Sequence, residues 1–160
     1  DQLRAFDLAQ QIAEMMSFIV HILAKTPIKL VQNLERGIAM HSYPGPLGQV
    51  LTNLVMNAAK HGFNDAQAGT ITVTCARDGE RACITVVDDG IGIPPENVGK
   101  IFDPFFTTKL GQGGTGLGLH ISHNMVYGPL GGRITVHSTP GVATSFTLHL
   151  PFNAPDANRT

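Results

Sequence analysis

Three segments of this 160-residue chain combine residue types and spacings that could do chemistry. The first is a polar row whose spacing would place its members on one face of a helix: Gln49, Asn53, Asn57, Lys60 and His61. Asn53 and Asn57 lie among apolar neighbours, where amides need hydrogen-bonding partners. An asparagine oxygen is also a ligand that suits a hard cation such as Mg²⁺. These residues alone leave a solvated helix face and a functional site as equal alternatives.

The second segment is a hydrophobic strand that runs into acidic residues and glycines. Asp88 follows Val86-Val87 and precedes Gly90 and Gly92. A carboxylate at a strand end can accept a hydrogen bond from an amino group such as the exocyclic amine of adenine, and glycines let the backbone approach a flat ring closely. An ordinary Asp-Gly turn accounts for the same residues, and it is the favoured interpretation of this segment taken alone.

The third segment, residues 101–119, is rich first in phenylalanine and then in glycine. Its glycines lead into a predicted helix, and backbone N–H groups at a helix start can bind phosphate. Gly111, Gly113 and Gly116 formally satisfy the dinucleotide pattern G-x-G-x-x-G, but the strand before it and the acid after it are missing. No Asp or Glu occurs from residue 104 to residue 155, so the segment still suits a polyanion.

The elements that must position these segments can be predicted from apolar periodicity and turn residues. The expected helices cover residues 6–25, 47–61 and 115–127, with a short one after Pro94-Pro95. The expected strands cover residues 28–31, 37–40, 71–75, 84–87, 133–137 and 144–150. Three helices with five or six mostly antiparallel strands predict a two-layer α/β sandwich.

The composition is that of one lightly charged globular domain. Hydrophobic residues make up 42% of the chain and charged residues 14%, and the net charge is −1 with the histidines neutral. A net charge this close to zero does not indicate binding to nucleic acid or to an acidic membrane. No apolar run approaches the roughly 18 residues that span a bilayer. Because no signal peptide is present, we expect a cytoplasmic domain with reduced Cys75 and Cys83. We expect this domain to cover residues 1–152 of a fragment without an initiator Met, followed by a frayed tail over residues 153–160.

The three segments follow one another along the chain, and the last expected hairpin adds Gly141-Val142-Ala143-Thr144-Ser145-Phe146. In this order they closely resemble the ATP-binding catalytic domain of sensor histidine kinases. That domain is a Bergerat fold in the superfamily shared with gyrase, Hsp90 and MutL. The resemblance runs from about Phe6 to Pro151, and its most specific parts are Phe-Phe-Thr-Thr-Lys at residues 105–109 and Gly-Thr-Gly-Leu-Gly-Leu at residues 114–119. It implies a mixed, mostly antiparallel sheet of about five strands packed on three helices.

The resemblance implies a site for ATP and Mg²⁺ that draws on all three segments. Asn57 would ligate the Mg²⁺ that bridges the triphosphate, with Asn53 beside it one turn earlier. Lys60 would contact phosphate, and His61 would lie next to the ribose and the phosphates. Asp88 would receive the adenine amine.

The remaining site residues are assigned by the same resemblance. Thr144 would lie near the adenine edge through a water, where Gly90 and Gly92 shape the pocket. A mobile ATP lid would run from about residue 94 to residue 114. The phenylalanines expected to anchor this lid are Phe102, Phe105 and Phe106. The other residues expected at the ATP site are Ile93, Phe102, Thr107, Thr108, Lys109, Gly114, Thr115, Gly116, Leu117 and Gly118.

One position separates activities within the superfamily. ATP-hydrolysing members carry a glutamate one turn before the metal-binding asparagine, as a general base toward water, and here that position is Asn53. An amide cannot abstract a proton at neutral pH, whereas an attacking neutral imidazole already has a free lone pair. The resemblance therefore implies a protein-histidine kinase, with Asn53, Asn57 and Lys60 as its catalytic residues.

The histidine that would accept the phosphoryl group is missing from the chain. His21 and Pro27 superficially echo the family's acceptor motif, but the acid of that motif is absent and Asn57 follows too soon for a helical hairpin. We therefore expect the acceptor on a dimerisation domain of the same parent protein, with a response regulator downstream. The alternatives are an anti-sigma-type serine kinase, which usually keeps the glutamate, and a nucleotide-binding regulatory module that no longer catalyses.

Overall fold

The computed structural model describes residues 2–61, 63, 68–106 and 117–156, and only the backbone of His61. The helices of this part of the chain are α1 (Leu8–Leu23), α2 (Pro44–His61), α3 (Pro95–Val98) and α4 (Gly118–Tyr127). Its strands are β1 (Arg4–Asp7), β2 (Ile28–Leu34), β3 (Ala39–Ser42), β4 (Gly69–Asp78), β5 (Arg81–Asp88), β6 (Arg133–Thr139) and β7 (Ala143–Pro151).

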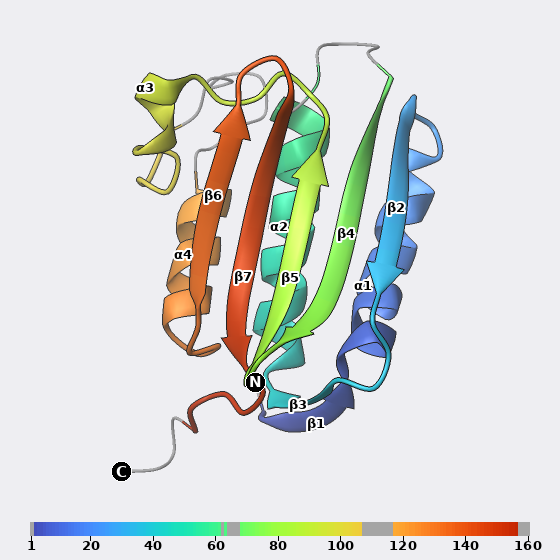
Figure 1. Ribbon diagram of the computed structural model, residues 1–160, viewed down its shortest axis with the longest axis vertical. Coiled ribbons are helices and arrows are strands. Elements are labelled where there is room, and N and C mark those ends of the chain that lie inside the picture. The colour runs from blue at the N-terminus through green and yellow to red at the C-terminus, as the bar shows by residue number, and fades with distance from the viewer. Residues whose placement is uncertain (1, 62, 64–67, 107–116, 157–160) are drawn as a thin grey trace.

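A five-stranded sheet in the order β2-β4-β5-β7-β6 forms one layer of the molecule. β2 lies parallel to β4, and the other neighbours in this sheet are antiparallel. Helices α1, α2 and α4 pack on one face of the sheet, and no described helix covers the other face (Figure 1). The two-layer α/β sandwich predicted from the periodicity is confirmed.

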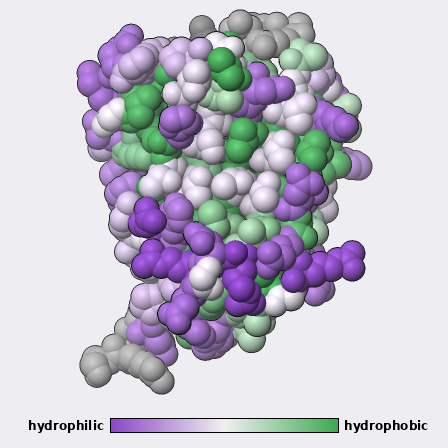
Figure 2. All heavy atoms as spheres, viewed as in Figure 1, coloured by the Kyte–Doolittle hydropathy of each residue, from purple (hydrophilic) through white to green (hydrophobic). Residues whose placement is uncertain are grey.

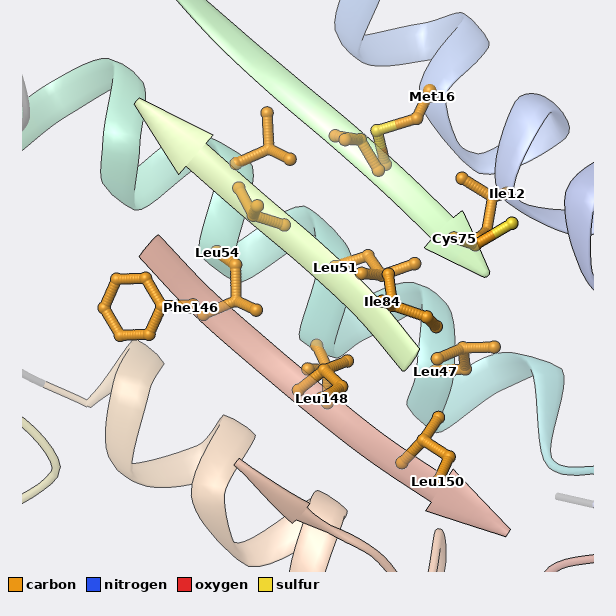
Figure 3. Packing of buried hydrophobic residues seen from close by; sticks show 14 of the residues in the cluster. Ile12, Met16, Leu47, Leu51, Leu54, Cys75, Ile84, Phe146, Leu148 and Leu150 are labelled. Carbon is orange, nitrogen blue, oxygen red and sulfur yellow. The ribbon is translucent and has the colours of Figure 1, made fainter. Parts of the chain in front are cut away.

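The core lies between α2 and the sheet. Leu47, Leu51 and Leu54 project from successive turns of α2 towards Ile84 on β5 and Leu148 on β7 (Figure 3). All five side chains are fully buried, and burial of such a side chain contributes about 1.5–3 kcal/mol to folding. This packing fixes the helix of the polar row against the strands that adjoin the acidic segment.

Helix α1 begins later than its apolar periodicity predicts. Residues 4–7 form β1, which pairs with β3 in a separate two-stranded sheet, and the helix starts at Leu8 rather than at Phe6. Asp7 caps it by accepting a hydrogen bond from Gln10 N at 3.0 Å.

The start of α2 also differs from the prediction. This helix begins at Pro44, three residues earlier than expected, because proline is tolerated in the first turn of a helix.

The chain after β7 returns to the two-stranded sheet. His41 N donates to Phe152 O at 2.7 Å, and Ala154 N donates to His41 O at 2.8 Å. The Tyr43 hydroxyl donates to Pro155 O at 3.2 Å. The contacts of the domain therefore continue past residue 152, where we expected a frayed tail to begin.

The face of the sheet that no described helix covers is shown in Figure 2. Weakly polar and hydrophobic side chains mix over its strands, and the most hydrophilic ones gather toward the end at which β5 begins. The opposite end is the one where β5 and α2 finish and where β6 turns into β7 (Figure 1). Most of the predicted site residues belong to elements that meet at this second end.

Candidate functional site

Asp88, at the end of β5, is a buried carboxyl group. Its side chain is 3% exposed, and its Oδ1 accepts a hydrogen bond from Gly90 N at 3.0 Å. Burial raises the pKa of this carboxyl from 3.8 to about 6; the Gly90 hydrogen bond opposes the shift, and the nearby Asp89 charge adds to it. A buried acid with a shifted pKa is typical of a functional site, because burial of its charge weakens the fold.

Thr144 on β7 lies next to Asp88 across the sheet. The two residues are register partners in the β5–β7 pair, and Thr144 is 4% exposed. A carboxylate and a hydroxyl therefore sit side by side on the helix-facing side of the sheet. This pair can accept a hydrogen bond from an amino group and exchange one with a neighbouring ring atom.

The loop that follows Asp88 is bonded to the turn between β6 and β7. Gly141 N donates to Ile91 O at 2.7 Å, and Ile93 N donates to the Ser138 hydroxyl at 2.7 Å. Gly92 lies between these bonds with φ +76°, and a Cβ on it would stand 2.7 Å from the Thr139 carbonyl oxygen. The bare Cα of Gly92 accommodates the β6–β7 turn. That Gly92 also makes room for a flat ring stays a prediction.

Replacing Gly92 by alanine is expected to destabilise the fold by about 2 kcal/mol, because the new methyl group meets a carbonyl and the backbone has a left-handed φ. In a chain of this length the melting temperature should fall by about 4–8 °C. Thermal unfolding measures the change. The control is Gly99→Ala, at a glycine with ordinary φ and open space around its Cα. Equal melting temperatures for the two variants would contradict this account of Gly92.

Asn53 connects α2 to the first turns of α4. Its Nδ2 donates to Gly118 O at 3.3 Å and to the hydroxyl of the buried Ser122 at 3.2 Å. Both amide protons are thus directed at α4, which leaves the Oδ1 atom of Asn53 as an acceptor.

Asn57 stands one turn after Asn53 on the same helix. Its side chain is half-buried and takes part in none of the side-chain hydrogen bonds found among the described residues. Lys60, further along, is exposed. Asn57 therefore offers a neutral oxygen, and Lys60 an exposed positive charge, at the end of α2 that lies nearest the β6–β7 turn (Figure 1).

The segment after α3 is held against α4 by two histidines to which sequence reasoning gave no site role. His120 Nδ1 donates to Phe102 O at 3.2 Å, and the rings of His123 and Phe102 are 5.3 Å apart. Phe102 also meets Phe146 of β7 edge to face at 6.2 Å. The spacing of three residues between the histidines was a signal for a shared helix face, but nothing in the sequence indicated their partner.

The expected phenylalanine anchors divide into two kinds. Phe102 and Phe106 pack against the core, as an anchor would. Phe105 is 68% exposed and has φ +66°, so it does not anchor the segment as expected.

The remaining expected site residues fall partly inside and partly outside the described part of the chain. Leu117 and Gly118 lie at the start of α4. The expected residues that lie outside the described part of the chain are the side chain of His61, Thr107, Thr108, Lys109, Gly114, Thr115 and Gly116.

Within the described part, no three His, Cys, Asp or Glu side chains are grouped to hold a metal ion. No helix described there is long and apolar enough to cross a membrane.

A family model described as histidine kinase-, DNA gyrase B- and HSP90-like ATPase matches residues 43–154. The sensor histidine kinase ZraS of Escherichia coli K12 is 44% identical over 110 residues, which cover 69% of this chain and 22% of that protein. The sensor protein TorS of the same organism is 37% identical over 133 residues, which cover 82% of this chain and 14% of that one. The chain thus spans less than a quarter of the length of either relative.

Solved structures show the same fold over almost the whole chain. A catalytic domain of the histidine kinase ThkA superposes with a TM-score of 0.84 at 28% identity, covering 96% of this chain and 97% of that one. Full-length ShkA, in complex with AMPPNP, superposes with a TM-score of 0.82 at 26% identity, covering 98% of this chain and 32% of that one.

Proposed function

We propose that this chain, which belongs to the family of histidine kinase-, DNA gyrase B- and HSP90-like ATPases, transfers the γ-phosphoryl group of ATP to a histidine on another domain of its parent protein. The observation that carries the proposal is the pairing of the buried Asp88 with Thr144 at the end of the sheet where α2 finishes. The chain is a catalytic domain of the sensor histidine kinase kind, and domains of this family bind ATP.

Adenine recognition is proposed for Asp88. Its Oδ1 is engaged by Gly90 N, so its other carboxylate oxygen is the acceptor for the exocyclic amine. An ionised carboxylate only accepts hydrogen bonds, and it would repel the carbonyl oxygen that guanine presents at the same place. The proposed site is therefore selective for adenine over guanine.

Asn57 is proposed to hold Mg²⁺ together with the phosphates of ATP. The fit rests on its donor chemistry, because a neutral oxygen outside the described hydrogen bonds suits a cation that keeps waters and phosphates as its other ligands. When bound, the ion supplies positive charge that offsets the charge of the triphosphate. Lys60 supplies further positive charge at the exposed end of the same helix.

The state of Asn53 supports transfer to histidine rather than hydrolysis. Its amide protons are bonded to Gly118 and Ser122, and an amide oxygen is too weak a base to take a proton from water. A neutral imidazole nitrogen can attack the γ-phosphorus with its own lone pair. The N–P bond then forms as the bond between the γ-phosphorus and the β,γ-bridging oxygen breaks, and ADP leaves with that electron pair.

The acceptor is proposed to lie on a dimerisation domain of the parent protein, with a response regulator as the next recipient. A solved complex of ThkA with the response regulator TrrA joins such a kinase to such a partner. We place the reaction in the cytoplasm, where ATP is available, and propose no role for nucleic acid or membrane lipid in this part of the protein.

The test combines this chain with the dimerisation domain of its parent, Mg²⁺ and γ-labelled ATP. We expect label on a histidine of the acceptor, in a phosphoramidate that is lost in acid, and none when that histidine is replaced by glutamine. Label that survives acid would indicate a serine ester and the anti-sigma type of kinase. Binding of ATP without any transfer to this acceptor would overturn the catalytic assignment and leave a nucleotide-binding module.

A further inference from the structure

Ser138 on β6 is a hydrogen-bonding centre next to the proposed adenine site. Its hydroxyl oxygen lies 2.7 Å from Ile93 N, 3.2 Å from Ala143 O and 3.1 Å from the Thr144 hydroxyl oxygen. It is the register partner of Thr144 across the β6–β7 pair, and it is partly buried. Asp88, Thr144 and Ser138 thus form one polar row over three adjacent strands.

The single proton of the Ser138 hydroxyl has two acceptors to choose from. Ile93 N–H donates to the serine oxygen, so the serine proton points either to Ala143 O or to Thr144. If it points to Thr144, the threonine proton is free to point at a ligand. If the serine proton points to Ala143 O, the Thr144 hydroxyl donates to Ser138 and presents only its lone pairs to a ligand.

The two directions matter for a purine ring. Adenine carries a ring nitrogen, N1, that accepts a hydrogen bond next to the amine proposed to bind Asp88. Guanine carries an N–H at the same position, and this group needs an acceptor. Because the two acceptors of Ser138 lie at nearly equal distances, either direction costs little, and the bound base can select one.

We propose that Ser138 is a positioning residue for the nucleobase, which directs its proton onto Thr144 and so makes the Thr144 hydroxyl a donor toward N1 of adenine or toward a water on N1. This inference rests on the proposed function, because it takes Asp88 as the partner of the amine. Ser138 itself does not touch the ligand. It acts through Thr144, and it also holds Ile93 and the loop after Asp88 in place.

The test compares binding of ATP and of 1-deaza-ATP, in which N1 is replaced by a C–H group, to the wild type and to Ser138→Ala. We expect the wild type to bind ATP several times more tightly than the analogue. In Ser138→Ala the Thr144 hydroxyl can still donate, but no proton from residue 138 orients it, so ATP binding should weaken about fivefold and the preference for ATP over the analogue should shrink. Ser138→Thr, which keeps the hydroxyl, should restore the preference.

A purely structural role for Ser138 predicts a different result. Loss of the Ile93 contact alone would weaken ATP and its analogue by the same factor, and that outcome would overturn the proposal. Ser145→Ala is the control, because Ser145 follows Thr144 on β7 and alternation places it on the opposite face of the sheet. If Ser138→Ala does not fold, Ser138→Cys takes its place in the same comparison. A wild type that binds neither nucleotide would instead contradict the proposed function.

Discussion

Replacing Asp88 by asparagine is expected to weaken ATP binding by about 100-fold while it stabilises the free protein. A charged hydrogen bond to the adenine amine is worth about 1.5–3 kcal/mol, and its loss gives most of this factor. The asparagine would keep its oxygen on Gly90 N–H and turn its NH₂ group toward the amine of the base, so that two donors meet. Titration with a fluorescent ATP analogue measures the change, since the chain has no tryptophan to report it.

The gain in stability follows from the pKa of Asp88. Burial raises that pKa from 3.8 to about 6, so the folded protein binds this proton more tightly than the unfolded chain does. Folding stability therefore falls as the pH rises from about 4 to about 6, and at pH 7 the buried charge costs up to about 3 kcal/mol. Asp88→Asn should melt at a higher temperature than the wild type at pH 7 and at nearly the same temperature near pH 4.

The pH dependence of binding provides a second readout of the same variant. ATP affinity of the wild type should fall as the pH drops below about 6, because the protonated carboxyl loses its charge, and the affinity of Asp88→Asn should not follow this profile. Asp89→Asn is the matched control, since Asp89 is exposed and its oxygen accepts from Thr70 N rather than facing the proposed site. Equal affinity of the wild type for ATP and GTP would contradict the role of Asp88.

The local patterns of the sequence predicted most of the fold. Alternation in β4 and β5 and the apolar stripes of α1 and α2 are short-range signals, and the structure confirms these elements. β1 could not be predicted in this way because its partner β3 lies 35 residues further along the chain. A four-residue strand with one partner is stabilised by pairing across this distance, and its own residues carry no repeated pattern.

The site shows the same limit at the level of single residues. Asp88 was assigned to the site by the family resemblance, because its own segment favours an ordinary Asp-Gly turn, and the structure buries it. Gly92 stood out as a glycine, but the group that excludes its side chain is Thr139, 47 residues later. Ser138 gave no signal, and the spacing of His120 and His123 indicated only a shared helix face, because a serine in a strand and histidines on a helix are ordinary until their partners in space are known.

Replacing Asn57 by alanine is expected to reduce phosphoryl transfer by about 100-fold or more at saturating Mg²⁺, and to leave ATP binding without Mg²⁺ almost unchanged. The removed oxygen is the proposed protein ligand of the ion, and a loss of about 2.7 kcal/mol of transition-state stabilisation gives a factor of 100. Asn57→Asp should keep binding but shift the Mg²⁺ concentration that half-saturates the site, because a carboxylate adds charge to the ligand set. Transfer to the acceptor domain, measured over a range of Mg²⁺ concentrations, checks both changes.

The fold should tolerate the loss of Asn57, which separates this effect from unfolding. Alanine forms helix better than asparagine by about half a kcal/mol, and the replaced amide makes none of the described side-chain hydrogen bonds. Asn57→Ala should therefore melt no lower than the wild type while transfer collapses. Gln49→Ala is the control, because it removes an exposed amide from the same helix two turns earlier and should change neither quantity. If Asn57→Ala transferred the phosphoryl group with the Mg²⁺ dependence of the wild type, other residues would have to hold the ion. The half-buried asparagine in the middle of α2 would then have no functional explanation.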